Sequence, residues 1–227
     1  MVNDLSNILD FGAESLVYVG SVFNMKVIVK HRISKPYRDA YYDKLFRESR
    51  TRIEARVLLD LSMNGLNVPK LIAVDLDNNV LIIEYIDGVR MDQIIEKLSD
   101  DKLRKYSYDI GYQVGRMHSL SIYHGDLTLA NIMVSRNDKI YIIDFGLAGY
   151  SRDVEEYAID VHLLKRSVEA LVPSRIMVFM DSFLKGYAES YSGDYKLVLK
   201  RLREVELRGR YVEARIRRGL RRDRYVE

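Results

Sequence analysis

The sequence contains no cysteine, which excludes disulfide bonds, and nothing in its composition favours a secreted protein. It also lacks any stretch that approaches the roughly 20 consecutive apolar residues of a membrane-spanning helix. Residues 1–10 carry acidic side chains and no long apolar run, so we expect no signal peptide. Together these absences predict a cytoplasmic protein that does not contact a membrane.

The chain nevertheless has enough apolar material for a folded core. Its 227 residues are 48% hydrophobic, which suffices for one domain, or for one domain divided into two lobes. The formal net charge is only +3, but arginine is concentrated from residue 201 onward. Such density favours contacts with phosphate groups. Because acidic residues are interleaved with the arginines, a solvated, ion-paired helix is an equal alternative.

The sequence is organised around His-Gly-Asp-Leu-Thr-Leu-Ala-Asn at residues 124–131. Within it, Asp126 is followed five positions later by Asn131, and an Asp-Phe-Gly motif begins at Asp144, thirteen residues after Asn131. Between the two motifs, residues 132–143 read as two short apolar strands joined by a polar turn. Such a hairpin is predicted to hold Asp126, Asn131 and Asp144 together at one end.

Transfer of a phosphoryl group from ATP requires such a set of side chains. One carboxylate accepts the proton of the attacking oxygen, the role we predict for Asp126. A second carboxylate and an amide oxygen hold Mg²⁺ against the phosphates, and Asp144 and Asn131 are the candidates. Each motif alone is common in ordinary turns, but the order H-x-D-x-x-x-x-N, hairpin, D-F-G is typical of kinases. We therefore predict a phosphotransferase with ATP and Mg²⁺ as cofactors.

The first part of the chain predicts a meander of three strands, at residues 5–11, 16–22 and 25–33. In kinases this region covers the nucleotide with a G-x-G-x-x-G loop, most of which is missing here. Only Gly12 is left, in the sequence Gly12-Ala13-Glu14-Ser15. Because Ala13 and Ser15 are small, backbone N–H groups can approach phosphates, so we assign these four residues to the nucleotide site. A plain hairpin turn is the alternative.

Lys30 ends the sequence Val-Ile-Val-Lys, which is similar to the kinase strand V-A-I-K whose lysine binds phosphates. Such a lysine needs an acidic partner from the next long helix. That helix is predicted over residues 39–64, with Gly65 as its C-cap. Glu54 is the first candidate partner and Glu48 the second, and a solvated charge at a strand end is the alternative for Lys30. Three neighbouring cations compete for its role: Lys26, Arg32 and Lys35.

Two further strands lead into the expected link between the lobes, and they are predicted at residues 71–76 and 80–85. The link begins with Glu-Tyr-Ile-Asp-Gly. There the backbone of Glu84 and Ile86 is expected to hydrogen-bond the edge of an adenine ring, while Val17 and Ile28 pack on its faces. A role as ordinary β-sheet core is equally compatible with these residues.

The rest of the chain predicts helices at residues 91–98, 100–120, 153–171, 174–191 and 194–207. His118 and His124 are expected to be structural, with His124 bracing the loop that carries Asp126. Asp160 is a candidate for tying its helix to that loop through backbone N–H groups, and a surface charge is the alternative. Only residues 147–152 separate Asp-Phe-Gly from the next helix, which argues against activation by phosphorylation of a long loop.

Taken together, these motifs resemble the small kinase subunit of the KEOPS (EKC) complex in its archaeal form. The stretches that carry the resemblance lie at residues 12–14, 29–38, 50–56, 124–131, 144–148 and 208–210. They span nearly the whole chain, and the Arg-Thr-Arg helix and the Arg-Gly-Arg stretch make them more specific than kinase motifs alone. The RIO kinases share the Gly-x-Glu-Ser turn but carry additional N-terminal domains.

The resemblance implies an α+β fold, a minimal bilobal protein-kinase-like fold. An N-lobe with an antiparallel sheet and a helix would occupy residues 1–86, a compact helical C-lobe residues 87–207, and an arginine-rich tail residues 208–227. In that family the lysine holds phosphates with its glutamate, the loop aspartate is the base, and the asparagine and second aspartate hold magnesium. The matching residues here are Lys30, Glu54, Asp126, Asn131 and Asp144.

The resemblance also implies partners. The C-lobe would bind the universal ATPase subunit of KEOPS, other KEOPS subunits would join, and the arginine-rich tail would lie near the active site or tRNA. The implied activity is ATP hydrolysis or serine phosphorylation, in support of threonylcarbamoyl-adenosine formation at position 37 of tRNA. Two alternatives stand beside it: a nucleotide-binding interaction module, and a small-molecule phosphotransferase of the aminoglycoside type, which usually has a larger helical lobe.

Overall fold

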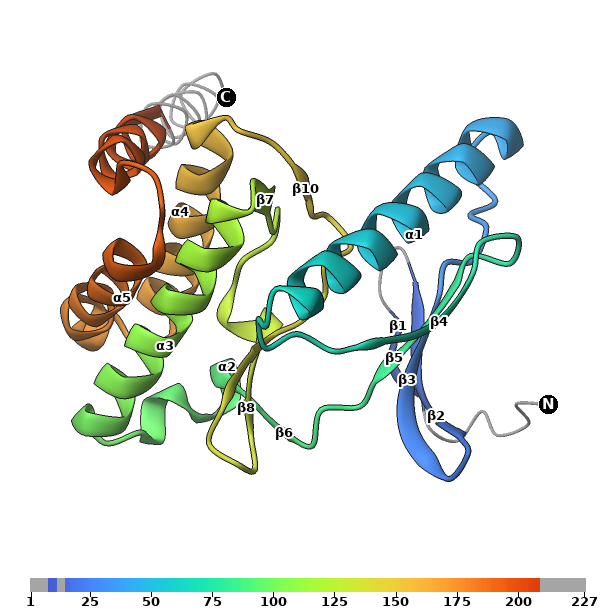
Figure 1. Cartoon of the computed structure of the whole chain (residues 1–227), viewed down its shortest axis with the longest axis horizontal. Helices are drawn as coiled ribbons and strands as arrows, with labels where there is room; N and C mark the ends of the chain where they lie inside the picture. Colours follow the sequence, from blue (N-terminus) through green and yellow to red (C-terminus); the bar gives the residue numbers. More distant parts are fainter. Residues whose placement is uncertain (1–7, 12–14, 209–227) are drawn as a thin grey trace, which may run out of the picture.

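The computed structural model describes residues 8–11 and 15–208. Figure 1 shows two halves, a β-sheet with one long helix beside it and a mostly helical half. The sheet is antiparallel, with its five strands in the order β1-β2-β3-β5-β4. Their bounds are β1 Ile8–Phe11, β2 Leu16–Val22, β3 Met25–His31, β4 Leu71–Asp75 and β5 Val80–Glu84.

β3 is the central strand of the sheet, as its run of β-branched residues favours. Pairing on both sides fixes its register, so that Lys30 lies opposite Val17 of β2 and Leu81 of β5. Lys30 and Val29 are both buried. The sheet therefore holds the predicted phosphate-binding lysine on its most constrained strand.

The long helix α1 (Ala40–Met63) connects β3 to β4 and packs against the sheet. It begins at Asp39, whose carboxylate accepts hydrogen bonds from the backbone N–H groups of Tyr41 (3.0 Å) and Tyr42 (3.2 Å). Apolar residues at helical spacing form its buried face, which includes Val57, Leu58 and Leu61. Glu54 lies on this same buried face and so points toward the sheet rather than into solvent.

The second half is built from four helices of the described chain. They are α3 (Asp100–Ser119), α4 (Val154–Leu171), α5 (Ile176–Ser190) and a helix over residues 195–208. α3 and α5 lie alongside one another in Figure 1 and share the most extensive contact in the molecule. A short helix, α2 (Met91–Ile94), leads into this half.

Short strands connect the helices to the loops that carry the predicted site. β6 (Gly88–Arg90), β8 (Ile132–Ser135) and β9 (Ile140–Ile142) form one small sheet, and β7 (Ile122–Tyr123) pairs with β10 (Gly149–Tyr150). β8 and β9 are the hairpin predicted between the two central motifs. β7 precedes the first motif and β10 follows the second, so each of the two loops lies between paired strands.

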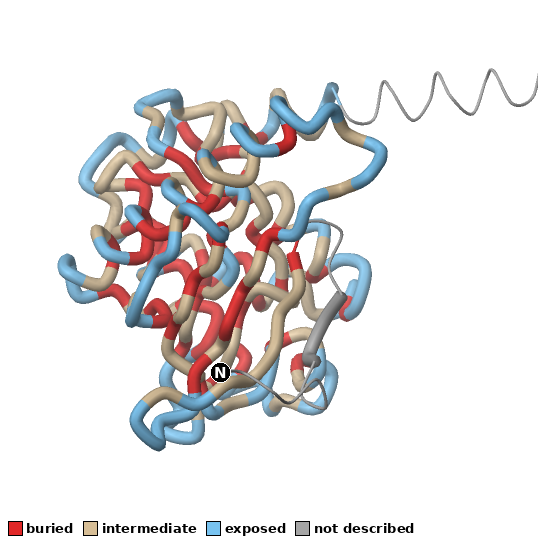
Figure 2. The backbone as a smooth tube through the Cα atoms, turned by 90° about the vertical axis from the view of Figure 1, so that its right-hand side faces the viewer, coloured by how far each residue is buried: buried red, intermediate tan, exposed pale blue. Residues whose placement is uncertain are grey.

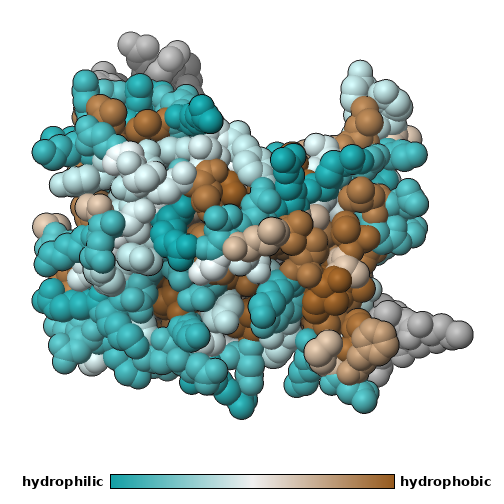
Figure 3. Space-filling model, viewed as in Figure 1, coloured by the Kyte–Doolittle hydropathy of each residue, from teal (hydrophilic) through white to brown (hydrophobic). Residues whose placement is uncertain are grey.

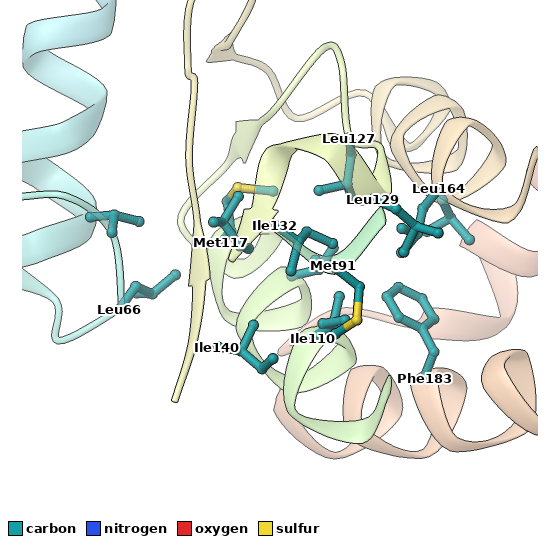
Figure 4. Close-up of a cluster of buried hydrophobic side chains, with 14 of the residues drawn as sticks. Leu66, Met91, Ile110, Met117, Leu127, Leu129, Ile132, Ile140, Leu164 and Phe183 are labelled. Carbon is teal, nitrogen blue, oxygen red and sulfur yellow. The ribbon is translucent and has the colours of Figure 1, made fainter. Parts of the chain in front are cut away.

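The buried side chains form a continuous core, which the tube in Figure 2 shows as buried backbone segments inside exposed loops. Figure 4 shows its centre in the helical half, where Met91, Ile110 and Phe183 come from α2, α3 and α5. Leu127 and Ile132 join the same cluster from the loop and hairpin of the predicted site. The core therefore supports the loop and the hairpin of the predicted site directly.

The surface differs between the two halves. In Figure 3 polar side chains cover most of the helical half, whereas apolar side chains gather over the sheet half. Ile72 and Val74 of the edge strand β4 are exposed. None of the helices within residues 8–11 and 15–208 is long and apolar enough to cross a membrane.

The predicted α+β, kinase-like fold is confirmed, with several differences in detail. The predicted strand 25–33 ends at His31, and the predicted helix 91–98 is α2 followed by a 3-10 turn at Ile95–Lys97. β6, β7 and β10 were not predicted. Residues 5–7 lie outside the described part of the chain. The division into lobes at residues 86 and 87 remains a prediction.

Candidate active site

A cavity of about 450 Å³ lies where the sheet meets the hairpin of the helical half. Its walls come from β2, β3 and β5 on one side and from the residues before and after the β8–β9 hairpin on the other. The predicted site residues among its lining are Val17, Ile28, Lys30, Glu54, Glu84, Ile86, Asn131 and Asp144. The structure thus brings together side chains that are separated by more than a hundred positions in the sequence.

The link after β5 forms one edge of the cavity. Ile86 lies beyond the paired strand, so its backbone is outside the β5 ladder, and Glu84 ends that strand. Val17 and Ile28 lie on neighbouring strands at the same cavity. This arrangement provides apolar walls and a backbone edge, which are the contacts that a flat heteroaromatic ring requires.

Lys30 joins two carboxylates at the cavity. Its ammonium group lies 2.9 Å from Glu54 Oε1 and 2.6 Å from Asp144 Oδ1. Burial by itself lowers the pKa of Lys30, but the charges of Glu54 and Asp144 outweigh this effect and raise the pKa above its usual 10.5. Lys30 is therefore a fixed positive charge at neutral pH. Glu48, the second candidate partner, instead pairs with Arg52 (2.6 Å), so Glu54 is the acidic partner of Lys30.

Asp144 is held in a constrained backbone conformation, with a φ of +60°. Its Oδ1 also accepts a hydrogen bond from the backbone N–H of Gly146 (3.2 Å). Burial by itself raises the pKa of Asp144, but the Lys30 ammonium and these hydrogen bonds reverse the shift and lower it below its usual 3.8. A Cβ on Gly146 would lie about 3.1 Å from Asp144 Oδ1, so a larger residue there would press on the Asp144 carboxylate.

Asp126 and Asn131 are joined within one loop. Asn131 Nδ2 donates to the backbone carbonyl of Asp126 (2.8 Å) and to its Oδ2 (3.0 Å). The backbone N–H of Asp126 in turn donates to His124 Nδ1 (3.2 Å). These bonds fix the orientation of the Asp126 carboxylate relative to the cavity that Asn131 lines.

His124 and Asp160 hold this loop in place, as the sequence predicts. The Asp160 carboxylate accepts hydrogen bonds from the backbone N–H groups of His124 (2.6 Å) and Gly125 (2.8 Å). Gly125 has a φ of +79°, and a Cβ there would collide with the Leu147 carbonyl. His124 Nε2 lies 3.0 Å from the carbonyl of Ile143, the residue before the Asp-Phe-Gly motif. One buried carboxylate and one imidazole therefore connect the two motifs.

His118 contacts the Asp160 carboxylate and so supports the same loop. Its Nε2 lies 3.2 Å from Asp160 Oδ2, and its Nδ1 lies 2.9 Å from the Tyr187 hydroxyl. Because a carboxylate only accepts hydrogen bonds, Nε2 carries the proton and Nδ1 accepts from Tyr187. Complete burial lowers the pKa of His118, which keeps the imidazole neutral. The prediction that His118 is a structural histidine agrees with this environment.

The donor atoms at the cavity suit magnesium. Both hydrogens of the Asn131 amide are used on Asp126, which leaves the Asn131 amide oxygen available as a ligand beside the Asp144 carboxylate. Such hard oxygen ligands, completed by phosphate oxygens and water, are what Mg²⁺ prefers. No group of three or more His, Cys, Asp or Glu side chains in the described residues could hold a metal ion by itself. The set therefore fits a metal that arrives with a phosphate ligand.

Comparison with known proteins agrees with this geometry. Residues 11–163 match the model of the protein kinase domain. The chain is 39% identical over 209 residues to KEOPS complex subunit Bud32 of Pyrococcus abyssi, which covers 89% of this chain and 94% of that protein. The chain belongs to the Bud32 family of protein kinases.

Other relatives combine this unit with a second one. A probable bifunctional tRNA threonylcarbamoyladenosine biosynthesis protein of Methanobrevibacter smithii is 37% identical over 90% of this chain, which spans 37% of that longer protein. The EKC/KEOPS complex subunit bud32 of Dictyostelium discoideum is 31% identical over 92% of this chain and 84% of that protein. The Bud32-type unit therefore occurs both alone and as part of a longer chain.

The contact of Arg32 with Glu54 was not predicted from the sequence of this Bud32 family member. Three of the predicted site residues lie outside the described part of the chain. Arg32, considered only as a competitor of Lys30, lies 2.5 Å from the second carboxylate oxygen of Glu54. The alternation of side chains along a strand was the available signal, since residues 30 and 32 share one face. Residues 12–14 are not described, so the shortened glycine loop stays a prediction. Ser15 is buried just before β2.

The arginine-rich tail lies almost entirely outside the described part of the chain, which includes only its first residue, Arg208. The Arg208 guanidinium bonds Glu155 Oε1 of α4 (2.7 Å). Arg201 of the preceding helix also lies near Glu155 (3.7 Å) and bonds Glu204 (2.8 Å). At this end of the helix the ion-paired alternative applies, whereas the role of residues 209–227 remains a prediction.

Proposed function

We propose that this kinase hydrolyses ATP or transfers its γ-phosphoryl group within a KEOPS complex that forms threonylcarbamoyl-adenosine on tRNA. The observation that carries the proposal is the convergence of Lys30, Glu54, Asn131 and Asp144 on one cavity, next to the loop that fixes Asp126. The names of the Bud32 relatives support the assignment to KEOPS.

In this proposal the chain contributes mainly positioning and charge. The backbone after Glu84 binds the adenine edge, and the apolar side chains of Val17 and Ile28 pack on the ring. Lys30, held by Glu54, binds phosphate oxygens as a fixed cation. Interactions of this kind supply most of the rate in phosphoryl transfer, because little covalent chemistry is left to the protein.

Asp126 acts as the base toward the attacking oxygen, which belongs to water or to a serine hydroxyl. Asn131 bonds its carboxylate and His124 accepts from its backbone N–H, so the loop holds Asp126 in place. Such a base contributes on the order of 10²–10⁴-fold to a rate. Magnesium, when bound, neutralises the phosphate charge. Asn131 and Asp144 would hold it.

The proposed partners follow the family. We infer that the helical half binds the universal ATPase subunit of KEOPS and that residues 208–227 contact tRNA. The short segment between Gly146 and α4 offers little surface for a peptide substrate, which supports ATP hydrolysis over broad protein phosphorylation. We propose that the protein works in the cytoplasm.

A turnover assay tests this proposal. Magnesium-dependent ATP turnover is measured for the purified chain alone, with tRNA, and with tRNA plus an archaeal KEOPS ATPase subunit. Turnover that rises with the partners supports a KEOPS ATPase or kinase. ATP binding without turnover under all three conditions would instead show a nucleotide-binding interaction module.

A further inference from the structure

Glu54 is shared by two buried cations. Its Oε1 lies 2.9 Å from Lys30 Nζ, and its Oε2 lies 2.5 Å from Arg32 Nη2. Glu54 and Arg32 are each 1% exposed, and Lys30 is 7% exposed. The single negative charge of the Glu54 carboxylate is thus shared between two positive charges, one on each oxygen. Lys30 is therefore only one of two groups that neutralise Glu54.

Arg32 is not part of the cavity wall, but its guanidinium lies next to Gly146, close to Lys30 and Asp144. Its backbone N–H donates to the Asn79 carbonyl (3.0 Å), and its Nη1 donates to Thr51 Oγ1 (3.4 Å). A Cβ placed on Gly146 would lie about 3.2 Å from both Arg32 Nη2 and Lys30 Nζ. Both cations thus lie close to Gly146, the last residue of the Asp-Phe-Gly motif.

The charges of this cluster balance only as a group of four. Lys30 and Arg32 carry two positive charges, and Glu54 and Asp144 carry two negative charges. If magnesium takes up the carboxylate of Asp144, the other three groups keep one net positive charge. A simple Lys–Glu pair without Arg32 would be neutral in that situation. Arg32 therefore decides whether the buried cluster attracts an anion.

We propose that Arg32 is a positioning residue for phosphate binding, which neutralises Glu54 and so leaves the charge of Lys30 for the phosphate groups of ATP. The inference rests on the proposed binding of ATP in the cavity and adds a residue to it. One unit charge at several ångströms, with an effective dielectric constant of about 20, changes the affinity for an anion on the order of tenfold to a hundredfold. The effect requires phosphates, so it does not extend to adenosine.

Binding measurements separate the charge of Arg32 from its structural role. Dissociation constants for ATP with magnesium and for adenosine are measured by calorimetry, and their ratio reports selectivity for phosphate. Arg32→Gln keeps a hydrogen-bond donor for Glu54 but removes the charge, whereas Arg32→Lys keeps the charge but loses the planar fork. Arg136→Gln removes a charge from an exposed ion pair with Asp87 and serves as the matched control.

We expect Arg32→Gln to lose tenfold or more of the selectivity for ATP over adenosine, while Arg32→Lys and the control stay within about threefold of the wild type. Unchanged selectivity in Arg32→Gln, or an equal loss in Arg32→Lys, overturns the inference. Absence of ATP binding by the wild type would instead overturn the proposed function, so the two failures are distinguishable.

Discussion

The hydroxyl of Tyr150 donates a 2.6 Å hydrogen bond to Asp60 Oδ2, and this bond joins β10 to α1 across ninety positions of the sequence. The Arg56 guanidinium lies over the same tyrosine ring, 5.4 Å from its centre. Because β10 pairs with β7, which leads directly into the loop of Asp126, the contact links the helix that carries Glu54 to that loop. The short segment after the Asp-Phe-Gly motif is thereby fixed to α1.

Tyr150→Phe should weaken this link without disturbing nucleotide binding. Loss of one partly exposed hydrogen bond lowers the free energy of unfolding by about 1 kcal/mol or less. We expect the kcat for ATP turnover to fall several-fold with an unchanged KM, measured by steady-state kinetics. Tyr112→Phe, a partly exposed tyrosine on α3, is the control. Equal kcat values for the two variants would show that the contact has no role in turnover.

Asp160→Asn should destabilise the loop of Asp126. The wild-type carboxylate accepts hydrogen bonds from two backbone N–H groups and from His118. The amide of asparagine has only one oxygen, and its NH₂ group would face at least one of these N–H donors. We expect the free energy of unfolding to fall by about 2–4 kcal/mol, measured by urea denaturation. Asp181→Asn, on the exposed face of α5, should change it by less than about 0.5 kcal/mol.

Stability should also fall in mildly acidic solution because of His118. Its folded-state pKa lies below the usual 6.5, so as the pH falls through 6.5 the unfolded chain binds a proton that the folded chain does not. The free energy of unfolding should then decrease by up to about 1.4 kcal/mol per pH unit until the folded pKa is reached. His118→Gln should flatten this dependence. The pKa of His162 is also lowered by burial, so His162→Gln should remove another part of the slope.

Removal of magnesium should weaken the binding of ATP through Asp144. In the wild type, we expect EDTA to lower the affinity for ATP tenfold or more and to leave that for adenosine unchanged. Asp144→Asn loses the carboxylate that would hold the ion, so its affinity for ATP should hardly respond to EDTA. A variant that responds as strongly as the wild type would remove Asp144 from the metal site.

Deletion of the arginine-rich tail tests the proposed contact with tRNA. A chain that ends before Arg208 should keep its ATP turnover but bind tRNA more weakly, and its binding should depend less steeply on salt concentration. Filter binding at several salt concentrations measures both effects. Unchanged tRNA binding would assign the arginines to ion pairs such as the one between Arg208 and Glu155.

The elements that could be predicted are those whose own sequence specifies them. The 24-residue helix α1 shows apolar residues at helical spacing and an aspartate cap, and β3 is a run of β-branched residues between turns. β7 and β10 have two residues each, and such strands exist only because distant segments pair. No local pattern could therefore reveal them.

The contacts of the site likewise divide into those that the local sequence predicts and those that it does not. Asp126, Asn131 and Asp144 were predicted from the spacing of two motifs. The predicted hairpin is present, Asn131 and Asp144 line one cavity, and Asn131 bonds Asp126, whereas their catalytic roles remain predictions. The direct contact of Lys30 with Asp144 depends on how the sheet half meets the other half, whereas the sharing of Glu54 with Arg32 depends on how α1 packs against the sheet. Both relationships follow from the packing of the core, which a pattern of residue types does not encode.

ATP binding and ATP turnover of Asp126→Ala beside the wild type test the role of Asp126 as the base. Asp126 is held by Asn131 and His124, but it is absent from the residues that line the cavity. We therefore expect Asp126→Ala to keep its ATP affinity and to lose turnover on the order of 10²-fold or more. Turnover equal to that of the wild type would contradict the role of Asp126 as the base and leave the cavity as a binding site only.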